Sequence, residues 1–309
     1  YLERFCVFLH KSAFFMEYIQ EFIRYLKFER RYSVHTQKAY EFDLIQFNDY
    51  LSSKYECTII DAKDVMVRSW MMFLIEGNCT KRSLNRKLSS IRQFYKYALR
   101  NDILFVNPTL RLVSLKSDKK IPSFISSSEM SFLLERINFP ESYEGKRDKA
   151  IIQMFYNTGM RLSELIALKI DDVNFSQKYV KVFGKRAKER IIPLLDSHLI
   201  DLKVYLDLRL SEFKSVDNLF LTASGKILYP KLVYRMVNSY LSRVTGVKQK
   251  SPHLLRHAFA THMLNDGADL NAVKDILGHA SLISTQIYTH NTAEQLKKVY
   301  KQAHPRGDK

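Results

Sequence analysis

Hydrophobic residues recur at helical spacing from residue 16 to about residue 113. Tyr40, Leu44, Phe47 and Leu51 are separated by 4, 3 and 4 positions, so they share one face of an α-helix, and Ser33 is a suitable residue to begin it. A second apolar face, further along the chain, is formed by Leu84, Leu88, Ile91, Phe94 and Ala98. The pattern predicts a helical first domain at residues 16–113, preceded by an N-terminal extension at residues 1–15.

A polar and basic segment at residues 114–123 interrupts the helical pattern, and Pro122 within it is incompatible with a helix interior. We predict that this segment links the first domain to a second one at residues 124–309. The second domain opens with Ser126, which is followed three residues later by Glu129, the spacing of a helix capping box.

The second domain combines helices with one short stretch of strand. Residues 148–157 and 161–168 have helical spacing, and a Thr-Gly break separates them. The period then changes, because residues 179–183 and 190–192 alternate as in strands, with a turn at 184–188 between them. Helical spacing returns near residue 231. The expected fold class is therefore mainly α with a small antiparallel β-sheet.

The charge balance narrows the choice of partner. The chain has 309 residues, 46% of them hydrophobic and 26% charged, as in ordinary globular proteins, but 49 basic residues against 32 acidic ones leave a net charge of +17. Such an excess favours a polyanion, either nucleic acid or an acidic membrane surface, although basic residues also serve solubility. No run of 18 apolar residues occurs in the sequence, so no membrane-spanning helix is expected.

More than half of the net charge lies between residues 81 and 120, where eleven Lys and Arg residues are accompanied by only Asp102 and Asp118. A solvated helix normally mixes the signs of its charges, so a phosphate-binding face is the better interpretation. The candidate DNA-binding residues are Arg82, Arg86, Arg92, Lys96 and Arg100.

The three cysteines, Cys6, Cys57 and Cys79, are widely spaced and form no Cys-x-x-Cys pair. This spacing argues against a disulfide framework or a thiolate zinc site, and it fits a reducing cytoplasm.

The second domain carries cationic and titratable side chains that have no obvious acid among them: Arg161, Lys185, His253, Arg256 and His279. Positioned cations stabilise a phosphate whose negative charge grows in a transition state. A tyrosine such as Tyr288 then serves as the nucleophile and forms a covalent link to the phosphate.

Each of these residues also has an ordinary structural interpretation. Arg161 could simply pair with Glu164 on its own helix, and Tyr288 is one of 18 tyrosines. His253 and His257 are four positions apart, a spacing that suits zinc, but no acid or cysteine stands at ligand spacing from them. Only the joint spacing of the set favours a catalytic role.

Four motifs carry that joint spacing: TGMRLSEL at 158–165, SPHLLRHAFATH at 251–262, LGH at 277–279 and TQIYTH at 285–290. In this order they strongly resemble the tyrosine recombinase family, and VYKQAHPR at 299–306 resembles its Xer branch of chromosome-dimer resolvases. Over residues 18–108 the resemblance is weaker but consistent with the family's helical core-binding domain.

The resemblance implies a role for each residue. Arg161 and Arg256 would clamp the scissile phosphate, and His279 would donate a hydrogen bond to it. Lys185 would protonate the leaving 5′ oxygen, with assistance from His253. Tyr288 would attack to give a 3′-phosphotyrosyl intermediate, with no metal and no other cofactor.

The resemblance also implies a two-domain clamp of C shape around double-stranded DNA, assembled as a tetramer of this chain or together with a second Xer recombinase. A mobile-element integrase of the same chemistry and a DNA-binding protein without catalysis are the alternatives. Two departures from the family pattern stand out: Arg186 replaces a frequent glycine in the turn, and 283–284 reads Ile-Ser where Ser-Thr is usual.

Overall fold

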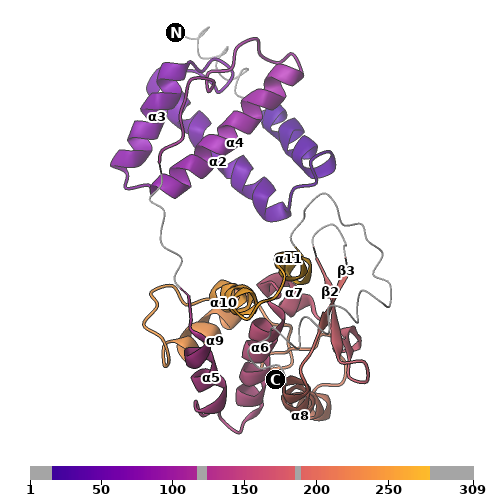
Figure 1. Cartoon of the computed structure of the whole chain (residues 1–309). Helices are drawn as coiled ribbons and strands as arrows, with labels where there is room; N and C mark the ends of the chain where they lie inside the picture. Colours follow the sequence, from indigo (N-terminus) through magenta and orange to yellow (C-terminus); the bar gives the residue numbers. More distant parts are fainter. Residues whose placement is uncertain (1–15, 117–123, 185–188, 279–309) are drawn as a thin grey trace. The chain divides into compact units, whose positions relative to one another are not determined.

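The computed structural model describes residues 16–116, 124–184 and 189–278 (Figure 1). The chain forms two compact units, Tyr1–Lys120 and Ile121–Lys309. Each unit has its own hydrophobic core. No helix within the described ranges is long and apolar enough to cross a membrane.

The first unit is entirely helical in its described part. A helix at residues 16–28 precedes three others, α2 (Val34–Tyr55), α3 (Asp64–Glu76) and α4 (Lys81–Arg100). Their core includes Trp70, which is fully buried and lies 4.9 Å from the Phe47 ring, centroid to centroid. The chain has one tryptophan, so the fluorescence of Trp70 reports on this unit alone.

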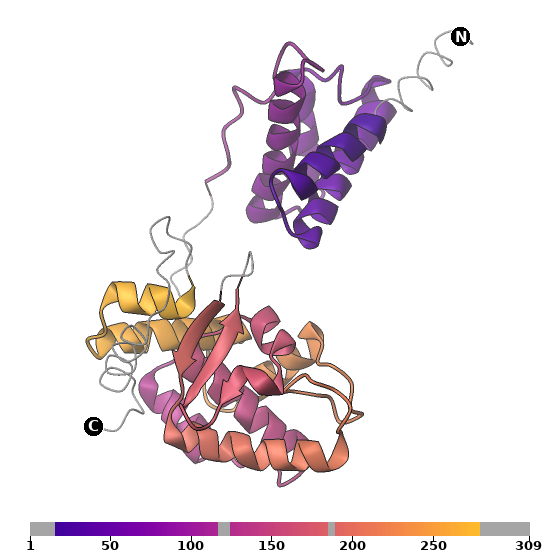
Figure 2. The ribbon, with the colours of Figure 1, turned by 90° about the vertical axis from the view of Figure 1, so that its right-hand side faces the viewer.

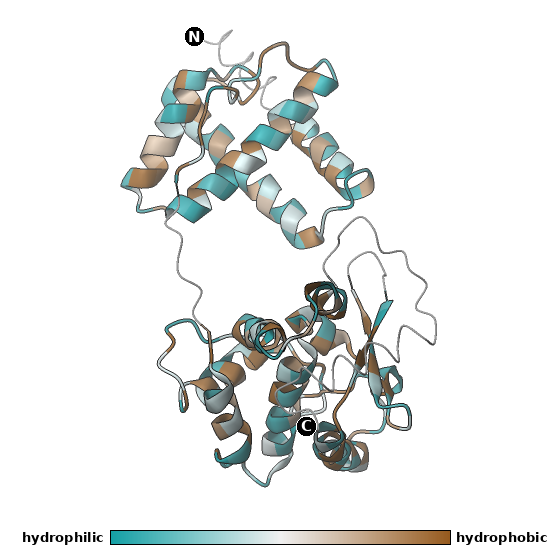
Figure 3. Cartoon of the chain, in the orientation of Figure 1, coloured by the Kyte–Doolittle hydropathy of each residue, from teal (hydrophilic) through white to brown (hydrophobic). Residues whose placement is uncertain are grey.

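The predicted apolar faces are confirmed in both helices. Leu44, Phe47 and Leu51 of α2 are fully buried, whereas Tyr40 is half-buried. All five apolar positions of α4 are buried. Ser33 caps α2 as expected, since its hydroxyl oxygen accepts the Thr36 N–H at 3.3 Å. Most of α4 outside its apolar stripe is hydrophilic (Figure 3).

A buried ion cluster joins α2 to α4. Asp43 has no exposed surface, and its carboxylate accepts hydrogen bonds from Lys87 at 3.0 Å and from the Ser90 hydroxyl at 2.8 Å. Arg86 pairs with both carboxylate oxygens of Asp43. A buried carboxylate requires such partners, so Arg86 also stabilises the packing of this unit.

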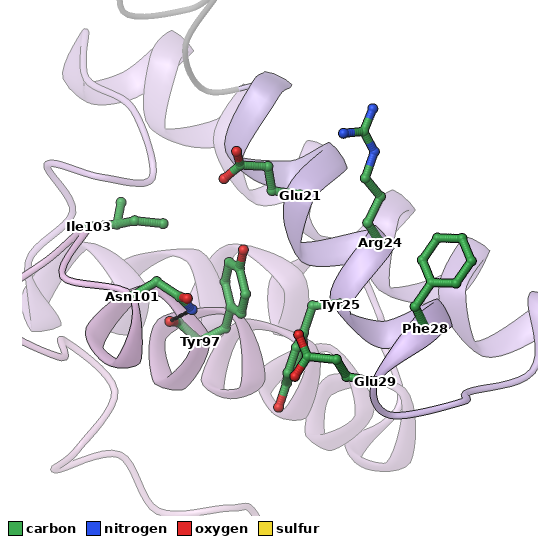
Figure 4. Close-up of a pocket in the computed structure, with 8 residues that line it drawn as sticks. All are labelled: Glu21, Arg24, Tyr25, Phe28, Glu29, Tyr97, Asn101 and Ile103. Atoms are coloured by element: carbon green, nitrogen blue, oxygen red, sulfur yellow. Dashed lines mark hydrogen bonds between the residues drawn. The ribbon is translucent and has the colours of Figure 1, made fainter.

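An open hollow lies between the helix at residues 16–28 and the end of α4 (Figure 4). Glu21, Arg24 and Glu29 bring charges of both signs to it, and the Tyr25 and Tyr97 rings are 5.0 Å apart. Burial, together with the nearby carboxylates of Glu21 and Glu29, raises the pKa of Tyr97. Because this surface carries charges of both signs, it differs from the exposed face of α4, whose charged residues are all basic.

The second unit surrounds α6, which packs against both α8 and α10. Its elements, in chain order, are α5 (Ser127–Glu135), α6 (Tyr143–Thr158), α7 (Leu162–Ala167), η1 (Ile170–Asp172), β1 (Val173–Asn174), β2 (Tyr179–Phe183), β3 (Glu189–Pro193), α8 (Asp196–Glu212), α9 (Pro230–Leu241), α10 (Pro252–Asn265) and α11 (Leu270–Leu277). The expected mixture of helices with one small sheet is confirmed.

The three strands form an antiparallel sheet in the order β1-β2-β3 (Figure 2). Val180 and Val182 of β2 are buried, and Val182 pairs with Arg190 of β3. Arg190 therefore occupies an inward-facing position of its strand. β3 in turn contacts α11, which brings the end of that helix beside the hairpin.

Two helix starts illustrate how local sequence sets the boundaries. Ser126 and Glu129 form the predicted capping box at the start of α5, with the Ser126 N–H donating to Glu129 Oε2 at 2.8 Å. Helix α6 begins at Tyr143, earlier than the predicted residue 148, because Ser142 caps it by accepting the Gly145 N–H at 3.3 Å.

Candidate active site

Two of the candidate arginines meet at the C-terminal end of α11. Arg161 is the residue that immediately precedes α7, and Arg256 lies in α10. Arg161 Nη2 donates to the Gly278 carbonyl at 3.2 Å, and Arg256 Nη2 donates to the Leu277 carbonyl at 2.8 Å. Segments that are far apart in the sequence thus converge on one helix end.

A third arginine, Arg190, completes the arrangement. Its Nε donates to the Ile276 carbonyl at 2.6 Å. Three successive carbonyls at the end of α11 are therefore bound by three different guanidinium groups. The last carbonyls of a helix have no partner within the helix and lie at its negative end, so cations stabilise them.

Glu164 connects two of these arginines. Its side chain is 4% exposed, and its oxygens accept from the Arg161 N–H at 2.7 Å and from Arg161 Nη1 at 2.8 Å. They also accept from Arg190 Nη2 at 2.7 Å and Nη1 at 3.1 Å. Burial alone would raise the pKa of Glu164, but the hydrogen bonds and charges of Arg190 and Arg161 keep it below its ordinary value. The carboxylate is ionised at neutral pH.

Arg256 is held from two sides. Its Nη1 donates to the Gly159 carbonyl at 2.5 Å, and its Nη2 to the Leu277 carbonyl. Burial and the nearby charge of Arg161 lower the pKa of Arg256 to about 10, so it remains protonated at neutral pH. The break between α6 and α7 needs glycine at position 159, because its φ is +58° and a Cβ there would lie 2.5 Å from Cδ1 of Phe259.

The histidines of α10 differ in their surroundings. His253 is exposed in the first turn of the helix, one turn before Arg256, and His257 is also exposed. His262 is buried, and its two ring nitrogens lie 3.0 Å from the Tyr156 hydroxyl and 2.8 Å from the Ile125 carbonyl. His262 therefore joins α10 to α6 and to Ile125, which precedes the N-cap of α5, and this is a structural role.

Replacement of His262 by leucine tests that role. The change leaves the Tyr156 hydroxyl and the Ile125 carbonyl without this partner, so we expect the second unit to lose about 2 kcal/mol of stability near pH 7.5. Far-UV circular dichroism during urea unfolding measures the loss. Trp70 fluorescence serves as an internal control because it reports on the first unit, and an equal shift of both signals would contradict the assignment.

The same variant has a predicted pH dependence. Burial lowers the pKa of His262 below its ordinary value, so the folded ring stays neutral where the unfolded ring binds a proton. The stability contributed by His262 is thus complete above the unfolded pKa of about 6.5 and declines as the pH falls. We expect the difference between the native chain and His262→Leu to be smaller at about pH 5.5 than at about pH 7.5.

Lys185, His279 and Tyr288 lie outside the described residues. In the sequence, Lys185 stands between β2 and β3, and His279 directly follows Gly278. Two residues that the sequence pattern did not single out, Glu164 as a bridge and Arg190, belong to the site. A charged residue at an inward position of an amphipathic strand is the signal that could have indicated Arg190.

The five candidate DNA-binding residues of α4 fall into two groups, according to whether they bind other described residues. Arg82, Lys96 and Arg100 are exposed, lie on one face at helical spacing and make no ion pair within the described part of the chain. Arg86 is on the same face but pairs with Asp43. Arg92 is half-buried and donates to the Ser114 hydroxyl at 3.0 Å and to the Leu112 carbonyl.

The site as a whole is cationic, and its one buried acid is neutralised by two arginines. Guanidinium groups bind phosphate oxygens well, because their planar set of donors matches two oxygens at once. Groups of three or more His, Cys, Asp or Glu residues suited to a metal ion do not occur in the described ranges. The geometry therefore fits recognition of a phosphate group.

Two family models match the chain. The model described as the phage integrase family covers residues 123–295, and the N-terminal SAM-like domain of phage integrases covers residues 19–102.

Curated relatives match over nearly their whole length. Tyrosine recombinase XerC of Staphylococcus carnosus is 39% identical over 301 residues, which span 95% of this chain and 99% of that protein. Tyrosine recombinase XerC of Chlorobaculum parvum is 36% identical over 316 residues, 93% of this chain and 94% of that protein.

A solved structure shares the fold. The XerH site-specific recombinase bound to palindromic difH substrate, in a post-cleavage complex, gives a TM-score of 0.70 at 24% identity, with 87% of this chain and 80% of that chain covered.

Proposed function

Because the chain belongs to the phage integrase family and is a tyrosine-type site-specific recombinase, we propose that Arg161, Lys185, His253, Arg256, His279 and Tyr288 form its catalytic set. Its substrate is double-stranded DNA at a specific recombination site. The observation that carries the proposal is the convergence of Arg161 and Arg256 on the residues that immediately precede His279.

The chemistry follows from these side chains. The Tyr288 hydroxyl loses its proton, a transfer that His253 assists, and its oxygen attacks the phosphorus; the bond from phosphorus to the 5′ oxygen breaks, and Lys185 gives that oxygen a proton. Arg161, Arg256 and His279 stabilise the negative charge on the non-bridging oxygens as it grows. A 5′ hydroxyl of another strand then attacks the phosphotyrosine in the reverse sense, so the phosphodiester bond is restored without an energy source.

The proposal is tested with a nicked duplex from which the short cleaved strand diffuses away. We expect the native chain to form a covalent protein–DNA adduct on the 3′ side of the break, detected by denaturing gel electrophoresis. Absence of an adduct on every duplex that the protein binds would contradict the proposed chemistry.

Resolution of chromosome dimers at cell division, in the cytoplasm, is the biological role that we propose. Its support is the similarity to XerC recombinases over almost the whole chain. A mobile-element integrase would use the same residues and the same chemistry, so the two roles differ in the DNA site and not in the mechanism.

We propose that the exposed basic face of α4, formed by Arg82, Lys96 and Arg100, binds the DNA backbone. We expect the triple replacement of Arg82, Lys96 and Arg100 by alanine to weaken binding to all sequences alike, and to flatten the salt dependence by about 0.9 log units per lost phosphate contact. Fluorescence anisotropy at several salt concentrations measures both effects. Weaker binding to one sequence only would mean that these side chains read bases.

Arg86→Met is the matched control for this face. Arg86 pairs with the buried Asp43, so we expect its loss to lower the unfolding midpoint of the first unit, followed by Trp70 fluorescence. The triple variant should leave that midpoint nearly unchanged, since none of its three residues pairs with a described acid.

Assembly as a tetramer on DNA is also proposed. Residues 289–303 have an apolar edge at Leu296, Val299 and Tyr300, and a short helix with one apolar edge must bury it on its own unit or on a neighbour. A head-to-tail contact between neighbouring subunits closes into a ring.

We expect truncation after Asn291 to leave binding to one half-site intact and to abolish cooperative filling of the second half-site and strand exchange. Sedimentation with full-site DNA measures this. A truncated chain that still assembles and recombines would place the segment on its own subunit.

A further inference from the structure

Arg190 is a buried cation that the proposed chemistry does not use. Its side chain is 4% exposed, and all three of its nitrogens donate hydrogen bonds: two to Glu164 and one to the Ile276 carbonyl. It is on β3, the strand that follows residues 185–188 in the sequence, of which Lys185 is the first. It therefore touches the partner of Arg161 and the end of α11 simultaneously.

We infer that Arg190 is a positioning residue for DNA cleavage, which fixes Glu164, and through it Arg161, against the end of α11. The inference rests on the proposed function, because it takes Arg161 as a phosphate-binding group. It assigns Arg190 no contact with DNA.

The sharing of Glu164 is the first physical reason. The two oxygens of Glu164 receive two donors from Arg161 and two from Arg190. Without Arg190, Arg161 would be the one described arginine still hydrogen-bonded to the buried carboxylate, and charges attract strongly where water is excluded. Arg161 would then be drawn toward Glu164 and would present less charge to a phosphate.

The position of Gly278 is the second reason. A Cβ at this residue would lie 3.2 Å from Arg190 Nη1, so the end of α11 rests directly against the guanidinium group. The bond from Arg190 Nε to the Ile276 carbonyl holds the same helix end. His279 is the next residue after Gly278 in the chain. A shift of Arg190 would therefore displace the residue to which His279 is joined.

Lysine cannot replace arginine here. A guanidinium group donates through three nitrogens in a rigid plane, whereas an ammonium group is a single point of charge at the end of a flexible chain. Arg190→Lys keeps the charge in the interior but cannot bind both Glu164 oxygens and the Ile276 carbonyl in the same geometry. The substitution therefore changes position more than charge.

The test is the single-turnover rate of cleavage on a nicked duplex, with protein in saturating excess and at a temperature well below the unfolding midpoint of every variant. We expect Arg190→Lys to cleave on the order of 10 to 100 times more slowly than the native chain, with DNA affinity nearly unchanged. A native rate in folded Arg190→Lys would overturn the inference.

Arg209→Lys is the matched control. Arg209 is also fully buried in the second unit and binds backbone carbonyls, those of Phe213 at 2.8 Å and Asn218 at 2.9 Å, whereas none of its hydrogen bonds among the described residues reaches Glu164 or α11. We expect it to lower the unfolding midpoint without changing the cleavage rate. An equal loss of rate in both variants would show that Arg190 matters only for the fold.

A double-mutant cycle with Arg161→Lys separates positioning from a general effect. If Arg190 acts through Arg161, the two substitutions together should slow cleavage little more than Arg161→Lys alone, whereas multiplying effects would contradict that link. Should Arg190→Lys fail to fold, Glu164→Gln breaks the same bridge at nearly constant size, and an unchanged rate in that variant would overturn the inference.

The two proposals fail in different ways. A native chain that forms no covalent adduct would contradict the proposed function. A native chain that cleaves, is slowed by Arg161→Lys and is unaffected by Arg190→Lys would contradict the role of Arg190 alone.

Discussion

Tyr288→Phe should bind DNA with nearly native affinity and form no covalent adduct at all. The substitution removes only the hydroxyl oxygen that attacks the phosphorus, and the phenylalanine ring keeps the size of the side chain. Every other group in the proposed set remains in place, so binding and catalysis should separate completely. The measurement compares adduct on a nicked duplex with anisotropy on the same DNA.

Tyr300→Phe is a suitable control, because Tyr300 is the next tyrosine along the chain and lies in the same C-terminal segment. It should form the adduct as the native chain does. If the adduct persists in Tyr288→Phe and disappears in Tyr300→Phe, the nucleophile has been assigned to the wrong tyrosine.

Lys185→Ala should slow cleavage roughly a hundredfold or more, the usual effect of losing a general acid. A substrate in which sulfur replaces the bridging 5′ oxygen should restore most of the rate, because a thiolate leaves without needing a proton. Single-turnover rates on the two substrates, for the native chain and the variant, give the comparison.

Lys188→Ala provides the control, since Lys188 stands three positions after Lys185 in the sequence between β2 and β3. Its rates on oxygen and sulfur substrates should differ as they do in the native chain. An equal defect of Lys185→Ala on both substrates would indicate that Lys185 stabilises charge and does not transfer a proton.

Local periodicity was sufficient to predict much of the fold. The apolar faces of α2 and α4 follow from residues that are three and four positions apart, and these were predicted correctly. The hairpin and the capping box at Ser126 depend on a few neighbouring residues as well. The sequence pattern yielded no assignment for α8, whose face is interrupted by the buried His198 and Arg209.

The candidate site was harder to predict, because its contacts are long-range. The motifs identified Arg161 and Arg256, but the bond from Arg190 to Ile276 joins residues 86 positions apart. No periodicity relates a strand position to a helix end at that separation. The same limitation applies to Arg86, whose charge suggested a DNA contact and whose partner Asp43 lies 43 positions away.

The orientation of α11 has a further consequence for selectivity. Many proteins bind free phosphate at the N-terminal end of a helix, where backbone N–H groups and the helix dipole attract anions. Here α11 presents its C-terminal end, so its dipole disfavours an anion. In addition, its last carbonyls each accept a hydrogen bond from one of the three arginines, which uses up some of the guanidinium donors. A free phosphate ion therefore gains little binding free energy at this site. A phosphate within DNA is held nearby by many other contacts, and its effective concentration compensates for the opposing dipole. The arrangement thus favours a phosphate that belongs to a bound duplex over the phosphate and nucleotides dissolved in the cell.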